Sequence, residues 1–353
     1  MKKYLINFLK FSLFLGVGLV ILYLVYQKQD AAYQEDCVLK NIPIAECSLI
    51  QKVVDDFKVV NYGWIGLVLL LFSLSNISRA IRWGMMQQSL GYQPRLINNF
   101  FAVMLGYFAN LGLPRLGEII RAGTISKYEN IPMEKVVGTV VVGRTLDVIC
   151  LLVVIGLAVL LEFDTVVRYL QELSQLKDKG IAMLGFLGVL AVLLGLVYLF
   201  RGKIEESKIY KKVVDLLKGL WEGIKTIAHI EKPGWFLFHT VNIWFMYFAM
   251  TYICFFAFEP TAHLSPKVGL MAFVVGAIAI TIPSPGGMGT YHLLVTSLLT
   301  LYGIAEADAF SFSNILFFSV QLGINVILGI IALIVLPIFN RNYKPKPPQI
   351  NKV

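Results

Sequence analysis

The sequence is poor in charge and in the short motifs that mark enzymes and metal sites. Only 15% of its 353 residues are charged, and it has four cysteines and four histidines. It lacks the glycine-rich, lysine-containing loop that binds nucleotide phosphates, so the chain would not hydrolyse a nucleotide by itself. It also lacks the CxxC and His-rich spacings of metal sites. We therefore expect neither a cofactor nor a metal, and the low charge excludes an ordinary soluble domain.

Apolar residues dominate instead. They make up 57% of the chain, with 24 Phe and a mean hydropathy of +0.72. A helix needs about 20 apolar residues to cross a hydrocarbon core of about 30 Å. Six runs reach that length, near 5–26, 61–78, 136–161, 181–200, 235–258 and 308–337. The sequence therefore predicts an all-α integral membrane protein, a multi-pass helical bundle with about six full spans.

Two further apolar segments, 97–112 and 268–302, are interrupted by proline and glycine. Both residue types disfavour a continuous helix, and backbone freed at membrane depth must be satisfied by protein or water. We expect two re-entrant hairpins that could belong to an inverted repeat, with their tips near the middle of the membrane. The residues expected to form the breaks are Pro114, Gly117, Pro283, Pro285, Gly286, Gly287 and Gly289.

The distribution of basic residues predicts the orientation. If the N-terminus lies inside, most of the 31 Lys and Arg fall in cytoplasmic segments, as they do in most membrane proteins. We expect a single membrane domain over residues 1–340 and a basic, extended cytoplasmic tail over 341–353. Both termini would then lie in the cytoplasm. The membrane would be the inner membrane of a bacterium. Anionic lipid headgroups account for the net charge of +9, so a nucleic-acid partner is not expected.

The expected outer loop, 27–60, contains Cys37 and Cys47. An oxidising exterior favours a disulfide between them. Two free thiols are the alternative, and the sequence does not decide between them.

Ionisable residues recur at a spacing of three within or beside the apolar segments, so each group shares one helical face. They are Arg79, Arg82, Arg115, Glu118, Arg121, Arg144 and Asp147. A charge near the bilayer centre costs at least about 2.5–3.5 kcal/mol, so it needs a partner, water or a ligand. Arginines outnumber acids, and the guanidinium binds phosphate in a bidentate manner, which together indicate an anionic ligand. Two alternatives remain open: some arginines could extend to the inner headgroups, and Arg144 could form a structural pair with Asp147.

Uncharged polar side chains add a third candidate group. Asn314, Gln321 and Asn325 return to one face of the last span, where they could line a headgroup path or join helices through hydrogen bonds. His292 follows the second break and is placed to contact a ligand.

Four segments together resemble the flippase-like transmembrane domain of lysylphosphatidylglycerol synthases and its stand-alone relatives. They are Arg79–Trp83, the run from Gly106 through Asn110 and Pro114 to Ala122, Gly143–Asp147 and Pro283–Gly289. The resemblance implies movement of phospholipids or lipid-linked molecules between leaflets, and it adds Asn110 to the candidate site. The chain lacks the soluble aminoacyl-transferase domain of bifunctional members, so lipid lysinylation is not expected. His292 also stands where many relatives carry glutamate.

The leading hypothesis is therefore a flippase-like transporter for an anionic phospholipid or a polyprenyl-phosphate-linked lipid. Arg82, Arg115, Arg121 and Arg144 would hold the headgroup. One alternative is a membrane-embedded lipid enzyme that uses Glu118, Asp147 or His292 as acid or base. The other is a non-catalytic partner of a separate cell-envelope glycosyltransferase or lipid-modifying enzyme.

Overall fold

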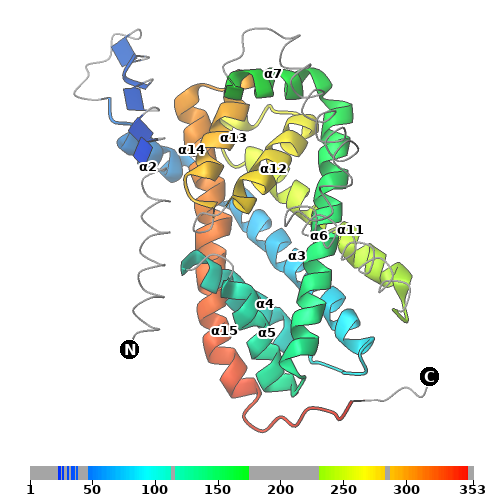
Figure 1. Ribbon diagram of the computed structural model, residues 1–353. Coiled ribbons are helices and arrows are strands. Elements are labelled where there is room, and N and C mark those ends of the chain that lie inside the picture. The colour runs from blue at the N-terminus through cyan, green and yellow to red at the C-terminus, as the bar shows by residue number, and fades with distance from the viewer. Residues whose placement is uncertain are drawn as a thin grey trace, which may run out of the picture. The chain divides into compact units, whose positions relative to one another are not determined.

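The computed structural model describes parts of residues 23–38 and residues 47–112, 116–174, 230–282 and 287–348 (Figure 1). Every regular element in these ranges is a helix. The described residues divide into two compact units, 1–141 with 230–353 and 142–229, and the long helix α6 (Met133–Leu161) runs from the first into the second.

Four helices are long and apolar enough to cross a membrane. They are α3 (Tyr62–Gln88), α6, α11 (Pro233–Phe255) and the continuous run Glu306–Phe339. These four agree with the spans predicted from the sequence, so the multi-pass helical class is confirmed. The predicted spans 5–26 and 181–200 lie outside the described residues.

Local sequence explains where these helices begin. The Asn61 side chain caps α3 by accepting a hydrogen bond from the Gly63 N–H at 3.0 Å. Pro233 opens α11, and Pro266 opens α12 (Pro266–Thr281), at the position where a helix needs no amide donor.

The two broken apolar segments form two helical hairpins. The first consists of α4 (Leu96–Gly112) and α5 (Leu116–Glu129), and the second of α12 and α13 (Thr290–Leu301). The longest of these helices has 17 residues, or about 25 Å, which is shorter than a hydrocarbon core. Such lengths fit the expected re-entrant geometry.

Small residues let the helices of each hairpin approach closely. A Cβ built on Gly106 would lie 2.9 Å from the Gly117 carbonyl oxygen, and one built on Gly117 would overlap the Gly106 carbonyl. The Asn110 side chain also accepts a hydrogen bond from the Gly117 N–H at 2.8 Å. In the second hairpin, a Cβ on Gly276 would lie 2.8 Å from the Tyr291 ring.

The last span is interrupted by a wider helical turn. It consists of α14 (Glu306–Leu316), a π-helical segment η4 (Phe317–Ile324) and α15 (Asn325–Phe339). The Asn325 amide donates to the carbonyls of Val320 and Gln321 at 3.2 and 3.1 Å, so it satisfies this irregular backbone. The apolar run 308–337 predicts an uninterrupted helical span, so the π-helical segment η4 is a difference from that prediction.

Both hairpins point toward η4 from opposite ends of the last span (Figure 1). Helix α4 runs antiparallel to α15, because Asn98 bonds Asn340 and Phe108 contacts Gly329. Helix α13 runs antiparallel to α14, because Thr296 lies 3.3 Å from Ser313 and the His292 ring lies 4.6 Å from that of Phe317. The described end of α4 and the start of α13 therefore lie close to the level of η4.

Polar contacts fix the base of the first hairpin. Glu129 at the end of α5 is buried and accepts hydrogen bonds from the Arg95 N–H at 3.0 Å and the Tyr343 hydroxyl at 2.9 Å. It also accepts from the Asn98 amide. The start of the expected tail is thereby tied to α4 and α5, which the sequence did not indicate.

Helix α2 and the residues just before it form a small module at the base of the second hairpin. Helix α2 (Leu49–Val59) packs against α14 through Leu49 and Phe310, and Lys52 forms an ion pair with Asp308 at 2.6 Å. Burial lowers the pKa of Lys52, but bonds to Asp308 and Asp56 outweigh it and raise the pKa.

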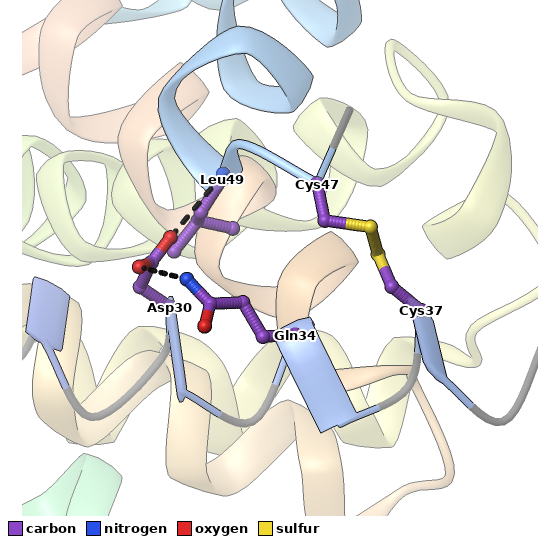
Figure 2. Close-up of a disulfide and its surroundings, with 5 residues drawn as sticks. All are labelled: Asp30, Gln34, Cys37, Cys47 and Leu49. Carbon is purple, nitrogen blue, oxygen red and sulfur yellow. Dashed lines mark hydrogen bonds between the residues drawn. A yellow bond between two sulfur atoms is a disulfide. The ribbon is translucent and has the colours of Figure 1, made fainter. Parts of the chain in front are cut away.

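A disulfide joins Cys37 to Cys47 just before α2 (Figure 2). Asp30 accepts hydrogen bonds from the Leu49 N–H at 3.4 Å and from the Gln34 amide at 2.9 Å. A carboxylate at this position also complements the positive end of α2. The disulfide and Asp30 therefore hold the residues before α2 at its N-terminus.

Candidate functional site

The first part of the site is a pair of buried arginines on α3. Arg79 is 6% exposed and Arg82 is 2% exposed, although both lie on a membrane-spanning helix. The Arg79 guanidinium donates to the Tyr247 hydroxyl of α11 at 3.1 Å. Helix α11 also contributes Asn242, which donates to Ser78 at 2.8 Å. Two polar contacts therefore join α3 to α11 at Ser78 and Arg79, and both arginines are buried.

The second part is Trp83, where α3, α5 and α6 meet. Its indole N–H donates to the Thr139 hydroxyl of α6 at 2.9 Å. The guanidinium carbon of Arg121 lies 3.7 Å from the centre of the Trp83 ring, which is a close cation–π contact. Trp83 thus places Arg121 of the first hairpin beside the arginines of α3.

The first hairpin sets the position of Arg121. A Cβ on Gly106 would lie 3.3 Å from the Arg121 Cβ, so the glycine leaves room for the arginine between α4 and α5. Glu118, one turn earlier on α5, is half-buried. The Asn110 side chain accepts a hydrogen bond from the Gly117 N–H and so caps the first turn of α5, which is a structural contact. The structure thus places Arg79 and Arg82 in buried positions on α3 and Arg121 over Trp83 of the same helix, with Glu118 one turn before Arg121 on α5.

The other predicted charges are placed differently. Arg144 is exposed and Asp147 is half-buried, and both belong to the second unit, on the part of α6 beyond Val141. Arg115 and Pro114 lie outside the described residues. They remain predictions.

The second break is described only at its end, because Pro283, Pro285 and Gly286 lie outside the described residues. Gly287 and Gly289 have φ of +84° and +83°, a conformation that favours glycine. The Thr290 hydroxyl donates to the Ala279 carbonyl at 3.1 Å and so ties α13 back to the end of α12. Gly287 and Gly289 therefore turn the backbone just before α13.

His292 lies deep in the second hairpin. It is 1% exposed, and the rings of Phe317, Phe310 and Tyr291 surround it. Its polar neighbour is Asn314, whose amide donates to the Phe310 carbonyl at 2.8 Å. In this conformation His292 is packed among aromatic rings and does not contact solvent.

The predicted polar face of the last span is only partly buried. Asn314 and Asn325 are buried, whereas Gln321 in η4 is half-buried. The amide nitrogens of both asparagines donate to carbonyls of the same span, and Asn314 also neighbours the His292 ring. These contacts favour a local structural role for the two asparagines.

Sequence reasoning missed several polar residues around Trp83. Gln87 and Asn99 are each 1% exposed, and Tyr247 and Thr139 provide the partners of Arg79 and Trp83. Gln87 could have been found, because it lies four residues after Trp83 and so shares its face of α3. Asn99, Thr139 and Tyr247 come from other helices, and sequence spacing does not reveal such contacts.

The four long spans, the paired hairpins and the buried arginines define a multi-pass α-helical membrane protein. The chain belongs to the family described as the lysylphosphatidylglycerol synthase TM region, whose model matches residues 48–329. That range contains both hairpins and the arginine site. A UPF0104 membrane protein of Methanocaldococcus jannaschii is 24% identical over 321 residues, which cover 81% of this chain and 89% of the relative. No solved structure matches the chain.

Proposed function

We propose that this protein moves an anionic lipid or a lipid-linked headgroup between the leaflets of a cell membrane, without hydrolysing a nucleotide. The observation that carries the proposal is the burial of Arg79 and Arg82 on a membrane span, with Arg121 held nearby over Trp83. A purely structural helix interface would be more stable with apolar or neutral polar residues, because buried charges lose their hydration. An anionic ligand would add a charged partner to the contacts that Arg79 and Arg121 already make with Tyr247 and Trp83.

The chemistry of arginine favours a phosphate-containing headgroup. The guanidinium keeps its charge when it is dehydrated, and its fork of donors matches two phosphate oxygens. Lipid phosphates are the anions that reach membrane depth in quantity. The description of the family, which names lysylphosphatidylglycerol synthase, is consistent with a phospholipid substrate.

The two hairpins supply a route for movement. Helices α4 and α13 approach the level of η4 from opposite ends of the last span, and π-helical segments are frequent at functional sites. The bases of the hairpins are fixed by Glu129 at one end and by α2 at the other. Motion of α4 and α5 against α12 and α13 would then open the arginine site to one leaflet at a time, as in transporters with paired broken helices.

The disulfide supports the orientation in which α2 lies outside the cytoplasm, because disulfides persist in oxidising compartments. Both termini then lie in the cytoplasm, and the membrane is the inner or cytoplasmic one. An ion gradient, the membrane potential or downhill lipid flow would supply the energy.

The test is to purify the protein gently and to compare its retained lipids with those of an Arg82→Gln, Arg121→Gln double variant. Loss of a charge-assisted hydrogen bond costs about 1.5–3 kcal/mol, so we expect retention of one anionic lipid class to fall at least tenfold. Arg341→Gln is the matched control, because Arg341 is exposed beyond α15.

A second measurement follows a fluorescent anionic lipid in vesicles that contain either protein. Transport by the wild type that is lost in the double variant supports the proposal. If both proteins carry the same unselective lipids and neither moves them, the arginines are structural. Recovery of a specific envelope enzyme with such a protein would then favour the role of a non-catalytic partner.

A further inference from the structure

Two buried amide side chains lie beside Trp83 with polar atoms that lack partners. Gln87 is 1% exposed, and within the part of the chain that the structure describes neither its Oε1 nor its Nε2 forms a hydrogen bond. Asn99 is also 1% exposed, and its Oδ1 has no partner among the described residues. Buried polar groups in folded proteins are normally satisfied, so a water, a ligand or another conformation must complete these.

The backbone of α3 brings the two amides to one place. A Cβ on Gly84 would lie 3.1 Å from the Asn99 Nδ2, so the missing side chain lets α4 approach α3 here. The same Asn99 amide donates to the Ala80 carbonyl at 3.4 Å. Gln87 lies one turn beyond Gly84, on the face of α3 that carries Trp83. The two amides and the indole therefore lie together in the last turns of α3.

The chemistry of these groups favours a hydroxyl as the missing partner. The carboxamide of Gln87 offers a donor and an acceptor whichever way it is flipped, and a hydroxyl can pair with both. An ammonium has donors only and would leave the Gln87 NH2 unsatisfied. A site built to hydrogen-bond a hydroxyl discriminates strongly against ligands that lack it.

The positive charge of the arginines also disfavours a ligand that carries an ammonium group. Arg121 already covers the Trp83 ring, so this ring face is not available to a ligand ammonium. Arg79 and Arg82 lie on the same helix, and like charges repel a further cation.

We propose that Gln87 and Asn99 bind the hydroxyl groups of the transported headgroup, so that the protein selects hydroxyl-rich anionic headgroups over amine-bearing ones. This inference rests on the proposed function, in which the arginines hold the phosphate. The amides then act as the specificity determinant of the same site.

The experiment measures lipid binding to the detergent-purified full chain by native mass spectrometry. Three synthetic lipids with identical acyl chains are compared: phosphatidylglycerol, phosphatidylserine and phosphatidic acid. The first two have the same net charge, but phosphatidylserine carries an ammonium and a carboxylate where phosphatidylglycerol carries two hydroxyls, and the third has phosphate alone. Because a hydrogen bond contributes about 1 kcal/mol, two or three of them predict roughly tenfold or greater preference for phosphatidylglycerol over phosphatidylserine.

The double variant Gln87→Met, Asn99→Leu should abolish this preference and leave phosphatidic acid binding unchanged. The single variant Gln87→Met serves the same purpose if the double variant does not fold. Gln51→Met is the control and should leave the preference unchanged, because it removes a hydrogen-bonding amide from α2, outside the site.

Equal binding of phosphatidylglycerol and phosphatidylserine by the wild type overturns the inference. So does a preference that survives in the double variant, which would mean that the amides hold water only. Neither result affects the arginine site. Unchanged phosphatidic acid binding in Arg82→Gln, Arg121→Gln would instead contradict the proposed function itself.

Discussion

Trp83 connects three helices through two kinds of contact, and each can be removed separately. Trp83→Phe deletes the hydrogen bond to Thr139 and keeps an aromatic ring under Arg121. Thr139→Val deletes the same bond from the other side. We expect a double-mutant cycle on the free energy of unfolding to give a coupling of about 1 kcal/mol, because a single neutral hydrogen bond joins Trp83 and Thr139. Strictly additive effects of the two changes would show that this bond does not stabilise the junction.

Tyr343 makes a prediction about pH, because it closes the buried site of Glu129. Burial, followed by the hydrogen bond to Glu129, raises the pKa of Tyr343 to about 12. A raised pKa means that the neutral phenol stabilises the fold below the unfolded value of about 10, and that this contribution is lost as pH rises toward 12. Tyr343→Phe should lower the free energy of unfolding by about 1–2 kcal/mol, equally at pH 6 and pH 9. Thermal unfolding at both pH values checks this, and a deficit that varies between them would contradict it.

The first hairpin depends on the close approach of its two helices. Gly117→Ala would place a methyl group against the Gly106 carbonyl, a backbone group that cannot rotate aside, and against the Asn110 side chain that caps α5. We expect this change to lower the free energy of unfolding by at least about 2 kcal/mol, because packed backbones must separate. Gly123→Ala, on the same helix, meets nothing within 4 Å and should be neutral or stabilising by up to about 1 kcal/mol. Similar thermal unfolding of the two variants would show that α4 and α5 need not pack so closely.

The module formed by α2 and the residues before it contains a disulfide between Cys37 and Cys47, at a sequence separation of 10 residues. In the chain-entropy model, closing a loop of this size contributes up to about 3 kcal/mol to stability, here to the order of α2 and the segment before it. Cys37→Ser, Cys47→Ser should therefore increase amide hydrogen exchange in α2 and leave exchange in α4 and α5 unchanged. Cys254→Ser, which alters a buried cysteine outside any disulfide, is the control. Unaltered exchange in α2 would mean that packing of Leu49 on Phe310 is sufficient.

The sequence predicts elements better than it predicts contacts between them. Apolar length alone identifies α3, α6, α11 and the last span, and the Pro and Gly breaks identify both hairpins. The π-helical segment η4 has no comparable signal, because Asn325 stabilises it through bonds that depend on the fold. The arginines are recognisable because a charge in an apolar run is costly. Their neighbours Thr139 and Tyr247 come from distant segments, and only the packing of α6 and α11 brings them to the site.

At the scale of the whole molecule, the disulfide and the basic residues make the same prediction about orientation from different physics. Disulfides require an oxidising compartment, which places α2 outside, and basic residues favour the cytoplasm, which places the end of α15 inside. We therefore expect a membrane-impermeant thiol reagent to label Val59→Cys in intact cells, because Val59 is 76% exposed at the end of α2.

The matched variant for the opposite side is Lys346→Cys, at an exposed position beyond α15, in the same background with Cys150 and Cys254 replaced by serine. It should react only after the membrane is permeabilised. Labelling of both positions in intact cells would place the C-terminal segment on the same side as α2 and contradict the predicted orientation of the last span. Protection of Val59→Cys with labelling of Lys346→Cys would reverse the whole orientation, and the disulfide would then have to persist in a reducing compartment.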